Sequence, residues 1–176
     1  MNNYNLYEQV IAKRNMCVPA VLQMVLKRFG IVMDQTSISE QLGIVPDNDS
    51  NNPKIWGTHI YDNTLNDFFQ NNSICLRENY IPINHFMDSV FLLDKLNELL
   101  PKETAIICGY NYSWLFGDKE DVFQHVSIII DVNEDKNEVV LLDPGPKDYG
   151  VKSVSADKLY DAIREAHDGL WCNYPR

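Results

Sequence analysis

The amino-acid sequence predicts an α+β fold in which helices come first and an antiparallel sheet follows. Amphipathic helical patterns dominate the first hundred residues, whereas short apolar runs typical of buried strands dominate residues 104–142. Two of these runs are separated by a short polar loop, as in a β-hairpin. Because helices and strands are segregated along the chain, we expect a helical layer packed on an antiparallel sheet.

The first helix is expected from Val18 to Phe29, where apolar residues recur with the period of one helical face. Asn15 is the expected N-cap, and Gly30 has the position of a left-handed C-terminal cap. Cys17 therefore lies in the first turn of this helix.

Three shorter helices are expected at 37–43, 63–71 and 89–100. The first is opened by a capping-box pattern, and the third is ended by a proline. A short strand is expected at 73–76. Residues 46–54 form a loop by composition, since Asn, Asp, Ser and Pro all favour turns.

Apolar runs at 104–110, 126–132 and 139–142 predict three buried strands. The polar residues 133–137 connect the last two as a hairpin. A final helix is expected at 156–166.

Length, composition and charge restrict the function. A chain of 176 residues is long enough to bury a sizeable core, so we predict a single domain over residues 1–176. The net charge of −10 disfavours binding to a nucleic-acid backbone or to an anionic membrane surface. There is no signal-peptide pattern and no apolar run long enough to span a bilayer, so we expect a cytoplasmic protein. No feature of the sequence indicates an oligomeric state.

The cysteines suggest chemistry at single positions. Cys17, Cys75, Cys108 and Cys172 form no CxxC pair, and no His/Cys pair recurs at ligand spacing, so we expect no metal and no other cofactor. Cys75 and Cys108 lie in apolar contexts and are expected to be buried and inert.

Cys17, His125 and Asp143 are the candidate catalytic residues. A thiol at a helix N-terminus faces unpaired backbone N–H groups, which lower its pKa. His125 begins one strand of the hairpin and Asp143 ends the other, so antiparallel pairing brings both to the same end of the ladder. Each residue also has a simpler interpretation. Cys17 could be a small buried side chain, His125 a structural histidine, and Asp143 a turn residue before proline.

Taken together, the three residues follow the chain order of papain-like cysteine enzymes. In that arrangement the cysteine attacks a carbonyl, the histidine takes and returns a proton, and the acid orients the imidazole ring.

The segments MCVPAVLQMVLKRFG, LNELLPKETAIIC and HVSIIIDVNEDKNEVVLLDPG resemble the papain-like peptidases that cleave double-glycine leaders from bacteriocin precursors. The resemblance runs from Gln9 to Pro146. It implies a bacterial thiol protease with a papain-like fold, in which the nucleophile helix packs on the sheet. It also implies Cys17 as nucleophile, His125 as general base and acid, and Asp143 as the orienting acid.

Two positions depart from that family. The family has glycine directly after the cysteine, whereas this chain has Val18, which is expected to narrow the site. The family's upstream glutamine, an oxyanion donor, corresponds to Gln9 at a longer separation from the cysteine. The resemblance further implies cleavage after small residues such as a Gly-Gly pair in an extended segment.

The first functional hypothesis is a cysteine peptidase or amide hydrolase that acts on a peptide or protein substrate through an acyl-enzyme. A catalytically inactive peptide-binding module and an acyltransferase or deamidase with the same triad are the alternatives.

His59 is expected at the surface, although Gly57 would let it approach a cleft. Three aromatic residues are candidate subsite residues: Trp56, Trp114 and Tyr112.

Overall fold

The computed structural model describes residues 3–45, 57–117, 124–145 and 148–176. The predicted loop at 46–54 and Trp56 lie outside these ranges. The described helices are η1 (Asn3–Leu6), α1 (Cys17–Arg28), α2 (Gln35–Leu42), α3 (Thr64–Asn71), η3 (Ile83–His85), α4 (Ser89–Leu99), α5 (Tyr112–Phe116), η4 (Glu134–Lys136) and α6 (Ala156–Glu165). The described strands are β1 (Ile44–Val45), β2 (Gly57–Thr58), β3 (Leu76–Pro82), β4 (Ala105–Asn111), β5 (Gln124–Asn133), β6 (Glu138–Asp143), β7 (Gly150–Ser155) and β8 (Gly169–Pro175).

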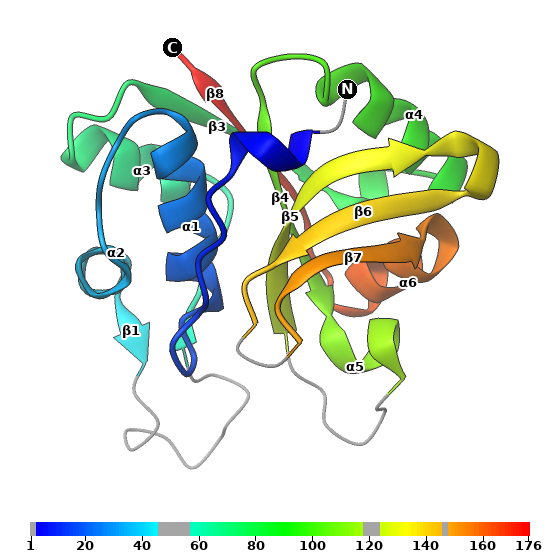
Figure 1. Cartoon of the computed structure of the whole chain (residues 1–176), viewed down its shortest axis with the longest axis horizontal. Coiled ribbons are helices and arrows are strands. Elements are labelled where there is room, and N and C mark those ends of the chain that lie inside the picture. The colour runs from blue at the N-terminus through cyan, green and yellow to red at the C-terminus, as the bar shows by residue number, and fades with distance from the viewer. Residues whose placement is uncertain (1–2, 46–56, 118–123, 146–147) are drawn as a thin grey trace.

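A six-stranded antiparallel sheet forms the centre of the molecule, in the order β3-β8-β4-β5-β6-β7 (Figure 1). The expected α+β fold with an antiparallel sheet is confirmed. However, β3 comes from the helical half of the chain and joins the sheet edge by pairing with the C-terminal strand β8. The predicted hairpin is β5–β6, in which Ile128 pairs with Leu142.

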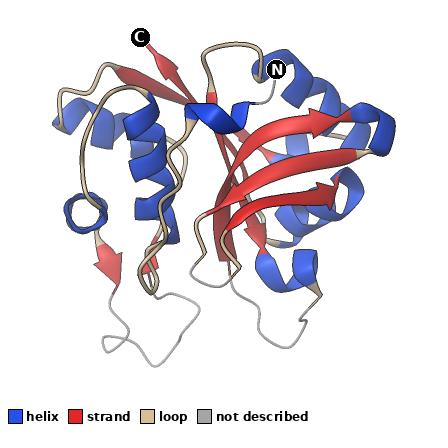
Figure 2. Ribbon diagram, viewed as in Figure 1, coloured by secondary structure: helices blue, strands red, loops and turns tan. Residues whose placement is uncertain are grey.

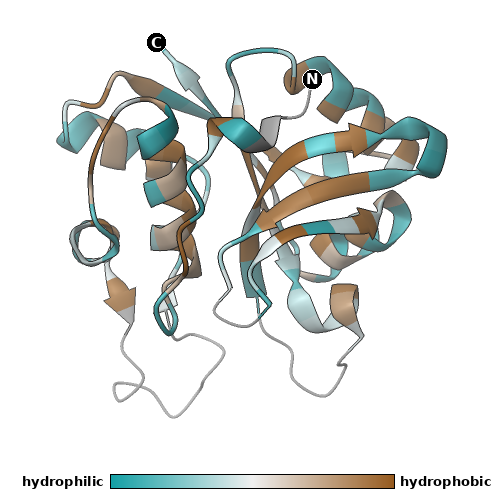
Figure 3. Cartoon of the chain, viewed as in Figure 1, coloured by the Kyte–Doolittle hydropathy of each residue, from teal (hydrophilic) through white to brown (hydrophobic). Residues whose placement is uncertain are grey.

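Helices cover both faces of this sheet (Figure 2). One hydrophobic cluster joins α1 and α3 to side chains such as Ile107 and Ile128. A second cluster joins α4 and α6 to Ile106 and Ile129, which point to the opposite face because successive side chains of a strand alternate. Figure 3 shows hydrophobic residues along α1 and the central strands, and hydrophilic residues at the turn between β5 and β6. The arrangement therefore has three layers, where the sequence predicted two.

Helix α1 follows its apolar pattern, but its N-terminal cap differs from the prediction. Gly30, at φ 75°, completes a Schellman motif in which the N–H of Ile31 bonds to the carbonyl of Leu26 at 2.9 Å. Met16, not Asn15, occupies the cap position and makes no side-chain capping bond; Asn15 instead has a left-handed backbone, with φ 57°. Cys17 is thus the first residue of the helix.

Other local predictions were wrong in their boundaries. Helix α2 begins at Gln35 because the Asp34 side chain accepts hydrogen bonds from the N–H groups that follow it, rather than at the capping-box serine Ser37. The strand expected at 73–76 begins only at Leu76, since Ser73 has a positive φ and terminates α3. As a consequence Cys75 is exposed, whereas Cys108 on β4 is buried as expected.

Candidate active site

Cys17 lies at the N-terminus of α1, where the fold brings it against the sheet. Its side chain is half-buried and shares a hydrogen bond with the imidazole of His125. Backbone N–H groups of Val18 and Val126 also donate toward the sulfur. The first N–H groups of a helix have no partner within the helix, so this position suits a negatively charged sulfur.

His125 and Asp143 contact each other across the β5–β6 hairpin. The Nε2 atom of His125 lies 2.9 Å from Oδ1 of Asp143, and both side chains are buried. The ring of Tyr112 packs edge-on against the imidazole, with 5.3 Å between ring centroids. The structure therefore brings together Cys17, His125 and Asp143 in a continuous chain of contacts.

The charges in this chain of contacts stabilise one another. Burial is the largest single effect on the Cys17 thiol and acts to raise its pKa, but the hydrogen bond and charge of His125 bring the pKa below its ordinary value. Burial likewise acts to lower the pKa of His125, yet its bonds to Asp143 and Cys17 raise that pKa to about 9. For Asp143, burial acts to raise the pKa, but His125 and Lys152 hold it below the usual range. These opposite shifts, down for the thiol and up for the imidazole, act in the direction of a thiolate–imidazolium pair.

Lys152 of β7 is a member of this site that sequence reasoning missed. Its Nζ atom donates to Oδ2 of Asp143 at 2.8 Å, while the N–H of Gly145 donates to Oδ1 at 2.8 Å. The ammonium also lies 4.5 Å from the ring centroid of Phe116 on α5. Asp143 is thus held from three sides, which fixes the carboxylate that faces His125.

Replacing Lys152 with methionine is expected to lower the free energy of unfolding by about 1–3 kcal/mol, because the fully buried Asp143 would keep its charge and lose one partner. Urea denaturation at pH 7 measures the effect. The matched control is Lys158→Met on α6, whose side chain is exposed; its change should stay within about 0.5 kcal/mol. Equal stability of the two variants would show that the ion pair contributes nothing.

The structure places the side chain of Gln9 beside the backbone of Asp143. Its side-chain amide donates to the backbone carbonyl of Asp143 at 3.2 Å and to that of Val10 at 3.1 Å. Gln9 is not among the described residues that line the pocket containing Cys17. Together with the bond from the N–H of Ala12 to the carbonyl of Pro144, it anchors the N-terminal segment to the end of β6.

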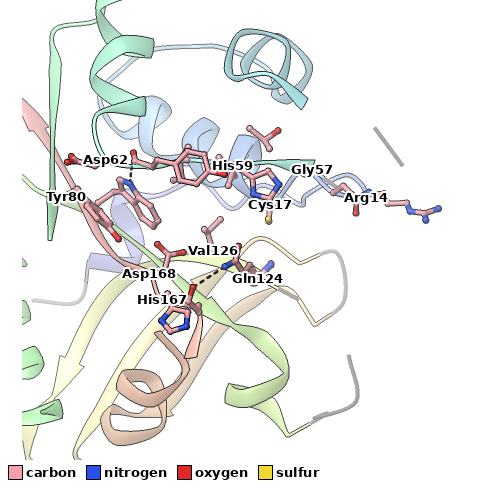
Figure 4. A pocket seen from close by; sticks show the side chains of 18 of the residues that line it. Arg14, Cys17, Gly57, His59, Asp62, Tyr80, Gln124, Val126, His167 and Asp168 are labelled. Carbon is pink, nitrogen blue, oxygen red and sulfur yellow. Dashed lines mark hydrogen bonds between the residues drawn. The ribbon is translucent and has the colours of Figure 1, made fainter. Parts of the chain in front are cut away.

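A pocket of about 500 Å³ opens next to the thiol (Figure 4). One wall comes from the start of α1 and from the segment after β2, and the other from β5 and the turn between α6 and β8. Gly57, at φ 111°, permits the close approach of β2 to the loop before α1, since a Cβ atom there would lie 3.0 Å from the carbonyl oxygen of Asn15. His59 lines the pocket and is half-buried, so its predicted surface position was wrong. Val18 also lines the pocket, whereas neither Trp114 nor Tyr112 is among its described lining residues.

Asp168 lines this pocket, and the sequence did not reveal it. It lies three residues after the end of α6, and burial raises the pKa of its carboxyl to about 7. The hydrogen bond from the N–H of Gly169, at 3.1 Å, opposes this shift only in part. Its position between a helix end and a strand gives no periodic or motif signal.

An acid whose pKa is higher in the folded than in the unfolded chain makes stability fall as pH rises between the two values. For Asp168 this window extends from about 4 to about 7. Asp168→Asn removes the effect, so its melting temperature should exceed that of the wild type by at least about 3 °C at pH 8 and by less at pH 5.5. Asp94→Asn, an exposed change on α4, is the control in these thermal scans. A difference that does not vary with pH would contradict the assignment.

Across the described ranges, no group of three or more His, Cys, Asp or Glu side chains is arranged to hold a metal ion. In the same ranges, no helix combines the length and the apolar character that a membrane crossing requires.

Several solved structures share the fold of this chain. Among solved structures, the chain is similar to a Bacillus anthracis protein described as a C39-like peptidase, with 14% identity, a TM-score of 0.68 and coverage of 97% of this chain and 95% of that one. It is also similar to the peptidase domain of Streptococcus ComA, a bi-functional ABC transporter involved in quorum sensing, with 17% identity, a TM-score of 0.60 and coverage of 97% and 99%. A third is a double glycine motif protease from an AMS/PCAT transporter, in complex with the leader peptide, with 13% identity, a TM-score of 0.58 and coverage of 97% and 92%.

At these identities the structures show that the fold is shared. No curated protein matches the sequence. The sequence pattern of one family, described as the Peptidase_C39 like family, matches residues 1–168, which is nearly the whole chain. The chain therefore belongs to the Peptidase_C39 like family.

Proposed function

We propose that the protein is a cysteine peptidase that hydrolyses peptide bonds through an acyl-enzyme on Cys17. The observation that carries this proposal is the continuous contact from the Cys17 thiol through His125 to Asp143, at the mouth of a pocket. The two hydrophobic clusters pack against opposite faces of one sheet. This shared sheet supports a single domain over residues 1–176.

Each residue has one chemical role in this proposal. The Cys17 thiolate attacks the carbonyl carbon of the scissile bond, and His125 gives its proton to the leaving amine. Water then attacks the thioester while His125 takes a proton from it, which releases the carboxylic acid and regenerates the thiol. Because Nε2 of His125 is bonded to Asp143, Nδ1 is the nitrogen that remains for the thiol. Asp143 orients the ring and stabilises its charged form.

The oxyanion that forms on the substrate also needs hydrogen-bond donors. The amide of Gln9 already donates to two backbone carbonyls, so we assign the oxyanion to the backbone N–H of Cys17, at the start of α1. A helix N-terminus stabilises negative charge through its unpaired N–H groups.

We further propose an extended peptide substrate with small residues next to the scissile bond. Val18 lines the pocket beside the thiol and adds a branched side chain there. One of the similar structures is a double glycine motif protease in complex with the leader peptide. A peptide library profiled against the protein should show cleavage after glycine or alanine; efficient cleavage after Phe or Leu would contradict a narrow site.

Brief treatment with iodoacetamide at neutral pH, followed by mapping of the modified cysteines by mass spectrometry, tests the nucleophile directly. Cys17 should be labelled first, because its pKa is lowered. Cys75 is exposed and serves as the internal reference. Cys108 and Cys172 should remain unlabelled, since both are buried and burial raises the pKa of each. Faster labelling of Cys75 than of Cys17 would overturn the proposal.

A further inference from the structure

The backbone around Asp168 is fixed in a way that determines where its side chain lies. Helix α6 ends in a Schellman motif, in which the N–H of Asp168 bonds to the carbonyl of Ile163 at 3.2 Å. His167 has the left-handed position of that motif, with φ 54°, which residues other than glycine rarely adopt. The carbonyl of Asp168 accepts from the N–H of Ile83 at 2.9 Å. A turn of this kind, bonded on both sides, holds the carboxylate in the pocket (Figure 4).

The neighbouring strand leaves room for this carboxylate. Gly109 of β4 lies directly beneath it, and a Cβ atom at that position would collide with the carboxylate of Asp168 and would lie 3.0 Å from the Trp171 ring. Gly109 does not have a positive φ, so a left-handed backbone is not the reason that glycine occupies this position. The space that it provides is occupied by the acid group of Asp168.

Asp168 makes no ion pair in the part of the chain that the structure describes, although Lys13, Arg14 and His125 line other parts of the same pocket. The hydrogen bond to its carboxylate there comes from the N–H of Gly169, and the described ion pairs do not include it. The nearby Tyr80 and Cys108 are neutral groups whose pKa values are raised, by burial first and by the charge of Asp168 in addition. Asp62, on the same pocket, is also acidic. Asp168 is half-buried. A partly desolvated carboxylate without an ion-pair partner is costly, and an incoming cation would remove that cost.

Aromatic rings complete the surroundings of Asp168. Tyr80 and Trp171 line the pocket and pack on each other, with 5.0 Å between ring centroids. Aromatic faces attract ammonium and guanidinium groups, particularly where water is displaced. An anionic group would meet two carboxylates here, and an apolar group would desolvate Asp168 without pairing it.

We propose that the Asp168 end of the pocket is a subsite for a positively charged group of the substrate. The group is the side chain of a lysine or arginine, or the free amino terminus of a peptide. This inference rests on the proposed function, because the subsite serves a peptide whose scissile bond lies at Cys17. The net charge of −10 would also attract cationic peptides over a longer range.

The first experiment measures the charge at the subsite without requiring catalysis. Cys17 is modified with methanethiosulfonate reagents that carry a trimethylammonium group or a sulfonate group, and the rate at Cys17 is read by peptide mapping. The wild type should favour the cationic reagent, and Asp168→Asn should reduce the cation-to-anion rate ratio about five- to tenfold. Asp94→Asn makes the same change of charge on the surface of α4 and should leave the ratio unchanged. An unchanged ratio in Asp168→Asn would overturn the proposal.

The second experiment identifies the source of the cation. Acetylated peptides carry lysine or the neutral norleucine at successive positions around a Gly-Gly pair, and a parallel set has free amino termini. A lysine preference at one position assigns the subsite to a side chain, whereas a preference for the free terminus assigns it to the amino group. Either preference should fall about tenfold or more in Asp168→Asn and persist in Asp94→Asn.

The two experiments distinguish failure of the cation subsite from failure of the peptidase function. If peptides are cleaved but show no preference that depends on Asp168, the subsite is excluded and the peptidase function stands. If no peptide is cleaved while the reagent ratio depends on Asp168, the cation subsite stands and the peptidase function fails.

Discussion

Replacement of Cys17 by alanine is expected to lower kcat/KM for peptide hydrolysis by at least about 10⁴-fold, while the melting temperature stays near that of the wild type. The loss is large because the acyl-enzyme forms on this sulfur. The other three described cysteines do not line the pocket: Cys108 and Cys172 are buried, and Cys75 is exposed just before β3. Stability is preserved because alanine fits the first turn of a helix and the side chain removed is only half-buried.

The matched control is Cys75→Ala, which removes an exposed thiol outside the pocket and should retain full activity. Activity is measured with the best peptide from the library, and folding by thermal denaturation. Hydrolysis by Cys17→Ala at a rate within tenfold of the wild type would show that Cys17 is structural and that the nucleophile lies elsewhere.

Replacement of His125 by alanine is expected to move the pKa of Cys17 upward, past its ordinary value. His125 supplies both the hydrogen bond and the charge that lower this pKa, whereas burial, the largest effect, acts in the opposite direction and would remain. A lowered thiol pKa keeps the thiolate present at lower pH. The alkylation rate of wild-type Cys17 should therefore begin to rise at a lower pH than that of the variant.

At pH 6.5 the variant should be alkylated more slowly than the wild type, and peptide hydrolysis should fall by about 10³-fold or more, because the general base is also lost. His85→Ala, an exposed change in η3, is the control and should keep the wild-type profile. Parallel pH profiles for His125→Ala and the wild type would mean that the imidazole does not set the ionisation of Cys17.

Features that depend on neighbours in sequence were predicted well. The period of the apolar residues fixed the course of α1 and placed Cys17 in its first turn. The β5–β6 hairpin placed His125 beside Asp143, because antiparallel strands joined by a short loop bring residues equally distant from it to the same end. The side-chain period of a strand is two, and the loop length restricts the register.

Features that depend on long-range pairing were missed. Nothing in the pattern around Leu76 shows that β3 will pair with β8, almost a hundred residues later, or that α4 will cover the opposite face of the sheet from α1. The N-terminal caps were also missed, since Met16 rather than Asn15 precedes α1 and Asp34 rather than Ser37 opens α2.

The candidate site divides in the same way. The sequence by itself indicated Cys17, His125 and Asp143 as one group of candidates, because the hairpin brings His125 and Asp143 together and the family resemblance adds Cys17. Only the tertiary structure decided that Lys152 supports Asp143, that Gln9 turns toward a backbone carbonyl, and that Asp168 shares the pocket with the thiol. The physical reason is that local periodicity sets which way a side chain points along its own element, whereas the charges and carbonyls that it meets come from segments whose packing the periodicity does not encode.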